Sequence, residues 1–334
     1  MTTNPAVSSG VGSMPGEDFT EAVRIALGEA PGLPFLPELP ARGVTAGMVG
    51  RTLGLVAELG FDLQPAGWRL TDAPGIDHRR ARSLLAQDLD VLEEQAQDLV
   101  GPLKVAVCGP WTLAATVERP RGDRLLADVG ARRELAQALA EGITVHLADL
   151  ARRVPGAELV VQVDEPALGA VLAARVPTSS GFGRHRSVDA PLASAALETV
   201  FAAISGSGAT PVAHSCAADL PIALLRGAGA RGISLDLDLL TAENYDALGA
   251  VLDAGDRVLL GVLASTDPGA GRLPTEQQVV DRVLRLLDML GFDPDEVRGQ
   301  LVLTPSCGLA GASPGYARTA LTLLRDSAAR LTSG

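Results

Sequence analysis

Short apolar runs alternate along this chain with longer segments in which apolar residues recur every three or four positions. Runs of the first kind are typical of buried parallel strands, and segments of the second kind are typical of amphipathic helices. We expect strands at 6–11, 34–36, 103–107, 159–163, 210–213, 232–235, 257–262 and 301–303. Helical patterns lie at 18–27, 44–59, 81–99, 131–152, 191–204, 241–252, 274–290 and 314–331. Eight strands alternating with helices predict an α/β protein built as a single (β/α)8 TIM barrel.

Two segments depart from this alternation. Residues 63–76 include Gln64-Pro-Ala-Gly-Trp68, which predicts a β-hairpin or a long excursion over the barrel mouth. Residues 176–191 include Ser179-Ser-Gly-Phe-Gly-Arg-His185, a glycine-rich loop that could close over a substrate or form ordinary surface. The chain shows no internal repeat, low-complexity tract or linker. We therefore expect one domain spanning residues 1–334.

Composition narrows the classes of protein to consider. The formal net charge of −12 argues against nucleic acid as a partner, because phosphates require a basic face. No run of eighteen apolar residues and no signal-like N-terminus occurs, so we expect a cytoplasmic protein that does not enter a membrane. Almost every basic residue is arginine, and Lys104 is the only lysine. Nothing in the sequence indicates the oligomeric state.

Reactive side chains gather where the predicted strands end. In a barrel of parallel strands the active site is built from residues that directly follow the strands. The predicted strand ends carry Gly12, Ser13, Glu38, Asp164, His214, Cys216, Asp236 and Cys307. The three cysteines of the chain are too few and too far apart for a disulfide framework, so a metal or a reactive thiol is the better use of them.

Four of these strand-end residues suit a zinc ion. An imidazole from His214, thiolates from Cys216 and Cys307 and a carboxylate from Asp236 can form a tetrahedral zinc site. In an extended segment, His-x-Cys places both side chains on one face. The alternative is that both cysteines are small buried hydrophobes and His214 a hydrogen-bonded core residue. Asp238 has the same facing as Asp236 and stays open as the carboxylate ligand.

Several motifs in the chain are similar to those of a known family. They are Val11-Gly-Ser-Met-Pro15, Pro37-Glu38-Leu39, Cys108-Gly-Pro-Trp-Thr-Leu113, Val161-Gln-Val-Asp-Glu-Pro-Ala-Leu168, His214-Ser-Cys216 and Pro305-Ser-Cys-Gly-Leu309. Together they resemble the catalytic C-terminal barrel of cobalamin-independent methionine synthases, in the superfamily that includes uroporphyrinogen decarboxylase. The resemblance covers nearly the whole chain and implies one methionine-synthase-like TIM barrel domain over residues 1–334.

The resemblance also implies roles for the strand-end residues. Zinc would be held by His214, Cys216, Asp236 and Cys307, and homocysteine by Gly12, Ser13, Glu38 and Asp164, with Asp164 and Cys216 the central catalytic pair. The physical chemistry agrees, because zinc deprotonates a bound thiol and carboxylates bind an ammonium group. From the residues alone, Asp164 could instead cap a helix, Glu38 could lie in a solvated loop, and Gly12 with Ser13 could form a plain tight turn.

The expected activity is zinc-dependent methyl transfer to the sulfur of a small thiol, homocysteine, with methionine as product. The methyl donor would be methyltetrahydrofolate or a methylcorrinoid. Three positions differ from the family pattern. Asp236 replaces a glutamate, Thr116 aligns with the folate-stacking tryptophan, and residues 263–267 lack the catalytic histidine. The alternatives are a zinc thiol methyltransferase with a corrinoid or another donor, and a non-catalytic relative that binds zinc or an amino acid.

Overall fold

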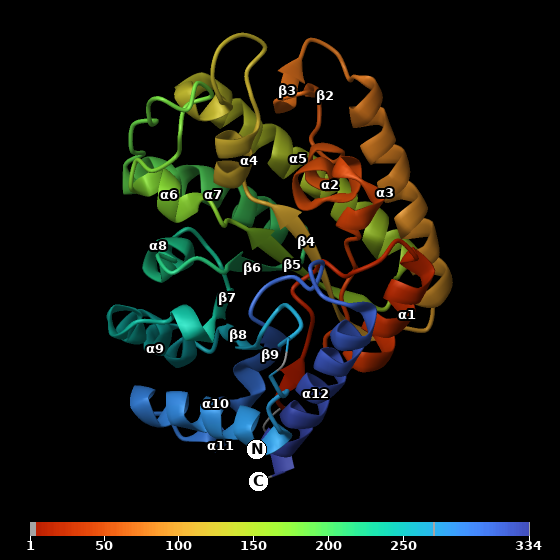
Figure 1. Cartoon of the computed structure of the whole chain (residues 1–334), viewed down its shortest axis with the longest axis vertical. Helices are drawn as coiled ribbons and strands as arrows, with labels where there is room; N and C mark the ends of the chain where they lie inside the picture. Colours follow the sequence, from red (N-terminus) through yellow and green to blue (C-terminus); the bar gives the residue numbers. More distant parts are fainter. Residues whose placement is uncertain (1–4, 270, 334) are drawn as a thin grey trace.

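A parallel sheet forms the centre of the molecule. The computed structural model describes residues 5–269 and 271–333. Within them the sheet comprises β1 (Val7–Ser8), β4 (Gly101–Cys108), β5 (Ala157–Asp164), β6 (Thr210–Ser215), β7 (Gly232–Asp236), β8 (Arg257–Leu263) and β9 (Leu301–Pro305). The strand order is β1-β9-β8-β7-β6-β5-β4, and all neighbours are parallel. The sheet is curled, and the helices lie around it (Figure 1). The predicted α/β class is confirmed.

The predicted closed barrel of eight regular strands is not what the structure shows. Residues 34–36 form no strand. Instead, Phe35 makes a single bridge to Lys104 of β4, and Glu38 makes one to Ser13 just beyond β1. The backbone N–H of Leu36 donates to Lys104 O at 2.8 Å. Pro34, Pro37 and Pro40 lack N–H donors, so this segment cannot pair as a continuous ladder.

The helices lie outside the sheet. The longer ones are α1 (Phe19–Glu29), α3 (Ile76–Gln95), α5 (Val129–Arg153), α7 (Ala190–Gly206), α9 (Tyr245–Asp253), α10 (Glu276–Leu290) and α12 (Pro314–Ser333). Shorter ones are α2 (Met48–Leu53), α4 (Pro110–Thr116), α6 (Leu168–Leu172), α8 (Ile222–Gly227) and α11 (Pro294–Val297). Short 3-10 turns occupy 40–42, 44–46, 125–127, 237–239, 242–244 and 298–300. Among the described residues, no helix combines the length and the apolar composition needed to cross a membrane.

Local signals explain several helix ends. Thr275 and Gln278 form a capping box at the start of α10, and Gly291 ends this helix in the left-handed conformation. Pattern analysis missed α4, α6, α8 and α11, because helices of four to seven residues complete at most two turns and show no clear period.

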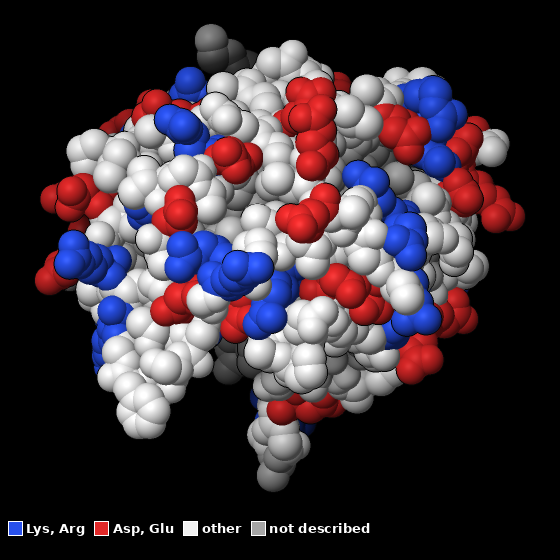
Figure 2. All heavy atoms as spheres, turned by 90° about the horizontal axis from the view of Figure 1, so that it is seen from above, with Lys and Arg blue, Asp and Glu red and all other residues white. Residues whose placement is uncertain are grey.

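The segment after α2, the loop 117–124 after α4 and the glycine-rich loop 176–191 lie together on one face of the molecule. The segment after α2 is the predicted hairpin, with β2 (Gly60–Gln64) antiparallel to β3 (Gly67–Thr71), and it lies at the top of Figure 1. Arg69 of the hairpin forms an ion pair with Glu118. Ser179 of the glycine-rich loop donates to the carboxylates of Glu118 at 3.2 Å and Asp123 at 3.0 Å. Viewed from this side, acidic and basic side chains are interspersed (Figure 2).

Candidate metal and substrate site

An imidazole and two thiols meet at one edge of the sheet. His214 lies near the end of β6, Cys216 directly follows that strand, and Cys307 comes two residues after β9. One ligand atom from each lies within 4.8 Å of the others, and the two sulfurs are 2.8 Å apart. The Nδ1 atom of His214 contacts Ser234 Oγ at 2.9 Å. This contact orients the ring and leaves Nε2 for a metal, as is usual for ligating histidines.

The two sulfurs of the group are less buried than that of the third cysteine in the chain. Cys216 and Cys307 are half-buried, whereas Cys108 is fully buried. Hydrogen bonds from Cys216 and His214 lower the pKa of Cys307 to about 4. The same contact with Cys307 raises the pKa of Cys216. The two cysteines are therefore half-buried neighbours in direct contact, and the interpretation of them as small core hydrophobes is wrong.

The structure does not bring Asp236 into this three-residue group. Asp236 ends β7, and its Oδ1 atom accepts a hydrogen bond from Asp238 N at 2.9 Å. Burial raises the pKa of Asp236, and the charge of Cys307 contributes in the same direction. Asp238 is 74% exposed and forms an ion pair with Arg282 of α10. Asp238 is therefore engaged with α10, whereas Asp236 stays at the end of β7.

Two buried carboxylates lie beside the sulfur group. Asp164 ends β5 next to His214 in the parallel register, and its Oδ1 atom accepts from Gln162 Nε2 at 2.7 Å. Glu38 is 5% exposed, and Arg51 Nε lies 3.9 Å from its carboxylate. Burial raises the pKa of Glu38 to about 7, and the charge of Asp164 adds to the effect. The solvated-loop interpretation of Glu38 is therefore wrong.

Asp164 does not cap a helix either. The residue at the cap position of α6 is Ala167, and no side chain makes the capping hydrogen bond there. The Asp164 side chain is 7% exposed, and burial raises its pKa, whereas the charge of His214 and the hydrogen bond from Gln162 lower it. Its carboxylate is therefore buried at the end of β5, next to His214 in the sheet.

The early glycine-serine turn reaches the same edge. Gly12 O accepts from Glu38 N at 3.1 Å, and Met14 N donates to Glu38 O at 2.8 Å. Ser13 packs against Gly308, where any Cβ would overlap the Ser13 hydroxyl. Because Gly308 directly follows Cys307, this contact brings Ser13 beside the sulfur group.

Lys104 and Gln162 were not predicted from the sequence to belong near the site. Lys104 is 1% exposed, and its Nζ donates to Val11 O at 2.7 Å and to Gln162 Oε1 at 2.8 Å. Gln162 is fully buried, and it shares a strand face with Asp164. Lys104 and Gln162 could have been noticed, because each is a single polar residue, one charged and one an amide, inside an otherwise apolar predicted strand.

Glu165, which directly follows Asp164 at the predicted strand end, had no role predicted from the sequence. Its carboxylate accepts from the backbone N–H groups of Trp111 at 2.9 Å and Thr112 at 2.8 Å, and from Thr112 Oγ1 at 2.7 Å. Burial raises the pKa of Glu165 to about 7. Any Cβ at Gly109 would overlap this carboxylate. The two motifs around Gly109 and Asp164 therefore meet through Glu165, which holds the start of α4.

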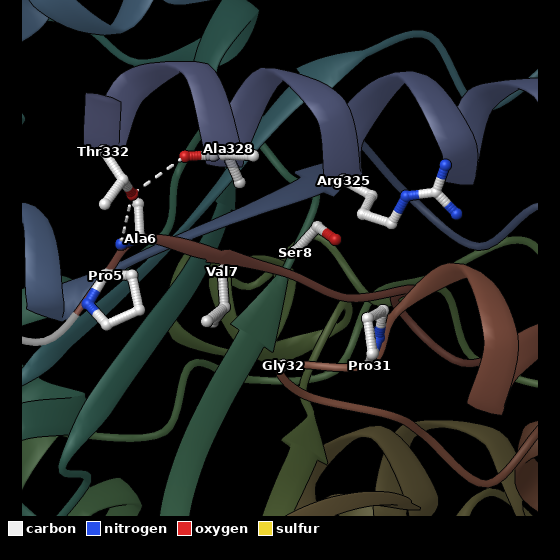
Figure 3. A pocket seen from close by; sticks show the side chains of 10 residues that line it. Pro5, Ala6, Val7, Ser8, Pro31, Gly32, Arg325, Ala328 and Thr332 are labelled. Atoms are coloured by element: carbon white, nitrogen blue, oxygen red, sulfur yellow. Dashed lines mark hydrogen bonds between the residues drawn. The ribbon is translucent and has the colours of Figure 1, made fainter. Parts of the chain in front are cut away.

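Two cavities lie away from this site. One of about 370 Å³ is lined by residues of β1 and α12, including Val7, Ser8 and Thr332, at the opposite end of the strands (Figure 3). There Ala6 N donates to Thr332 Oγ1 at 3.1 Å. Another of about 360 Å³ lies among α4, α5 and α7 beside Trp111. Neither contains a residue of the sulfur group.

Comparison with solved structures identifies similar folds. A B12-independent methionine synthase from Shewanella sp. W3-18-1, solved in complex with selenomethionine, is 14% identical with a TM-score of 0.62, and the match covers 98% of each chain. Bacillus subtilis mannanase BCman is 11% identical with a TM-score of 0.48, and the match covers 98% of this chain and 87% of the mannanase. At 14% identity, the likeness to the Shewanella enzyme shows the fold alone.

Sequence comparison identifies the family. A search of curated proteins finds no match. The family model described as "Cobalamin-independent synthase, Catalytic domain" matches residues 93–330, which is more than two thirds of the 334 residues. The matched region contains the sulfur group, Asp164, Glu165 and Lys104. The protein therefore belongs to the family of cobalamin-independent synthase catalytic domains, which makes it a methyltransferase of the methionine synthase family.

Proposed function

We propose that this protein binds homocysteine and methylates its sulfur to form methionine, with zinc as its metal. The observation that carries the proposal is the group of His214, Cys216 and Cys307 within 4.8 Å, beside the buried carboxylates of Glu38 and Asp164. Family membership supports methyl transfer. The selenomethionine named for the Shewanella enzyme is the selenium analogue of the proposed product.

The donor set fits zinc. Two thiols and an imidazole are soft and borderline ligands, and tetrahedral zinc accepts this combination. His214, Cys216 and Cys307 would hold the ion, and Asp236 would be the fourth protein ligand. When bound, zinc would lower the pKa of the substrate thiol.

The remaining residues bind and orient the substrate. Glu38 and Asp164 receive the α-ammonium group through charge-assisted hydrogen bonds, and the turn at Gly12 and Ser13 receives the carboxylate. In the reaction the substrate thiol releases its proton to solvent, and its sulfur forms a bond to the methyl carbon. The electron pair of the broken methyl bond leaves with the donor. The protein contributes to the reaction by orienting the substrate sulfur.

The methyl donor is methyltetrahydrofolate in this proposal, and a methylcorrinoid is the alternative. Thr116, which aligns with the folate-stacking tryptophan, is exposed, and its Oγ1 donates to Thr112 O at 2.7 Å. The Trp111 ring does not take over that position. It is buried, its Nε1 donates to Ala193 O at 3.0 Å, and Arg132 covers its face.

We further propose that residues 1–334 act as one domain, since segments at both ends of the chain share a sheet. A cytoplasmic location follows from the proposed chemistry, because the free thiols of Cys216 and Cys307 require a reducing compartment.

The first test is the metal content of purified protein after exhaustive dialysis. Wild type should retain about one zinc per chain, and Cys307→Ser should lose most of it, because a hydroxyl is a poor zinc ligand. Cys108→Ser is the matched control. Its sulfur is fully buried outside the group, so this variant should retain zinc as wild type does. A wild type without zinc would contradict the proposal.

A donor screen follows on zinc-loaded protein. Formation of methionine from homocysteine and methyltetrahydrofolate is the expected result. Activity with methylcobalamin alone would show that the methyl donor is a methylcorrinoid, and the proposed thiol chemistry would stand. Binding of zinc and homocysteine without turnover for either donor would identify a non-catalytic relative instead.

A further inference from the structure

The single lysine of this chain is buried beneath the carboxylates of the site. Lys104 lies in the middle of β4, is 1% exposed, and has its ammonium 5.8 Å from the centre of the Phe35 ring. A buried ammonium is unfavourable unless hydrogen bonds and opposite charges compensate for lost hydration. Here the acceptors are Val11 O at 2.7 Å and Gln162 Oε1 at 2.8 Å.

Lys104 determines which way the Gln162 amide faces. An ammonium group has three donors and no acceptor, so the amide must turn its oxygen towards Lys104. The amide nitrogen then faces the other way and donates to Asp164 Oδ1 at 2.7 Å and Val11 O at 2.9 Å. A reversed amide would place its nitrogen against the ammonium and its oxygen against the carboxylate, which is repulsive at both ends.

The charge of Lys104 also acts on both carboxylates. Burial raises the pKa of Asp164 and of Glu38, and the positive charge of Lys104 opposes both shifts. Burial lowers the pKa of Lys104 to about 8, and the charges of Asp164 and Glu38 act in the opposite direction. On the other side, Arg51 is the cation nearest Glu38. For Asp164, the charge of Lys104 adds to the larger effect of His214 and to the hydrogen bond from Gln162.

We propose that Lys104 is a positioning residue: through Gln162 it orients the Asp164 carboxylate to accept the α-ammonium group of the substrate. Lys104 thereby makes the site selective for thiols that carry an α-amino group. The inference rests on the proposed function and deepens it. Lys104 itself does not contact the substrate in this arrangement.

The test compares two ligands on zinc-loaded Lys104→Met and wild type. The ligands are homocysteine and 4-mercaptobutanoate, which lacks only the α-amino group, and calorimetry measures both dissociation constants. Lys104→Met should weaken homocysteine binding about tenfold or more, as for loss of a charge-assisted hydrogen bond. Binding of 4-mercaptobutanoate should change less than about twofold, because that ligand makes no use of Asp164. In assays, KM for homocysteine should rise with little change in kcat.

Two further variants separate positioning from packing. Gln162→Met interrupts the relay at its second member and should reproduce the effect of Lys104→Met, with little further loss in the double variant. It also tests the proposal if Lys104→Met does not fold. Phe35→Leu removes the ring beside the same ammonium but keeps the relay, so it should lower stability and preserve the preference for homocysteine.

The outcomes distinguish the relay from the proposed function. If wild type prefers homocysteine and both relay variants keep that preference, the role of Lys104 is overturned and the proposed function stands. If the variants lose affinity equally for both ligands, the role of Lys104 is also overturned, because Lys104 would then have only a structural role. If zinc-loaded wild type binds neither thiol, the proposed function itself fails, and the role of Lys104 fails with it.

Discussion

At the scale of single residues, environment determines what each ionisable group can do. Cys108 and Cys307 are the same residue type, but burial raises the pKa of Cys108, whereas hydrogen bonds from Cys216 and His214 lower that of Cys307. Glu38 and Glu165 are both buried carboxyls with a pKa raised to about 7. They differ in their partners: Glu165 accepts hydrogen bonds from the start of α4, whereas Arg51 Nε lies 3.9 Å from the Glu38 carboxylate.

The raised pKa of Glu38 predicts pH-dependent binding of methionine, whose thioether sulfur carries no titrating proton. The ligand ammonium binds the ionised carboxylate, so Glu38 must release its proton when methionine binds. Affinity should therefore rise with pH up to about 7 and level off above it. Well below pH 7, the affinity for methionine should rise about tenfold per pH unit.

Calorimetry between about pH 6 and pH 7.5, in two buffers of different ionisation enthalpy, measures both the affinity and the proton release. Glu38→Gln should bind methionine more weakly and with a flatter pH profile. An unchanged profile in Glu38→Gln would show that another group is responsible.

At the scale of elements, short helices are held by side chains that come from neighbouring strands. The start of α4 carries backbone N–H groups without partners inside the helix. Glu165, which follows β5, supplies acceptors for Trp111 N and Thr112 N, and Thr112 Oγ1 also donates to it. Gly109 permits this close approach because it has no side chain.

Gly109→Ala should destabilise the protein by about 2–3 kcal/mol, because the new methyl group displaces Glu165 and leaves buried donors without acceptors. Urea denaturation gives the free energy of unfolding of the variant and of wild type. Gly28→Ala is the control, since Gly28 lies in α1 and a Cβ there meets no atom within 4 Å. That variant should be neutral or slightly more stable. Equal stability of Gly109→Ala and wild type would refute the role given to Glu165.

At the scale of the whole molecule, buried groups link stability to pH in opposite directions. His146 of α5 is 7% exposed, and burial together with the charge of Arg51 lowers its pKa to about 4. In the unfolded chain a histidine titrates near 6.5, so the unfolded state binds a proton in the window between these values. Stability is therefore lost as the pH falls from about 6.5 to about 4. The raised pKa values of Glu38 and Glu165 have the opposite effect and stabilise the folded state as pH falls below 7.

His146→Gln should isolate the histidine contribution. At pH near 4.5 the variant should lose less stability, relative to its own value at pH 7, than wild type does. The difference is at most about 3 kcal/mol, from about 1.4 kcal/mol per pKa unit. Urea denaturation at several pH values measures it. Parallel stability curves for the two proteins would exclude His146 as the source of acid sensitivity.

By itself, the sequence determined the alternating strands and helices, the hairpin and the candidate site, because apolar periodicity and strand-end motifs are local properties. The six strands β4 to β9 match the predicted runs closely, and His214, Cys216 and Cys307 meet as expected. Only the tertiary structure decided the contacts between distant residues. Gln162 contacts Val11 across 151 positions and Lys104 across 58. It also showed that prolines reduce residues 34–38 to single bridges, that Asp238 pairs with Arg282, and that Glu165 holds α4. These contacts depend on which side chains the curled sheet brings together, and no local sequence pattern predicts them.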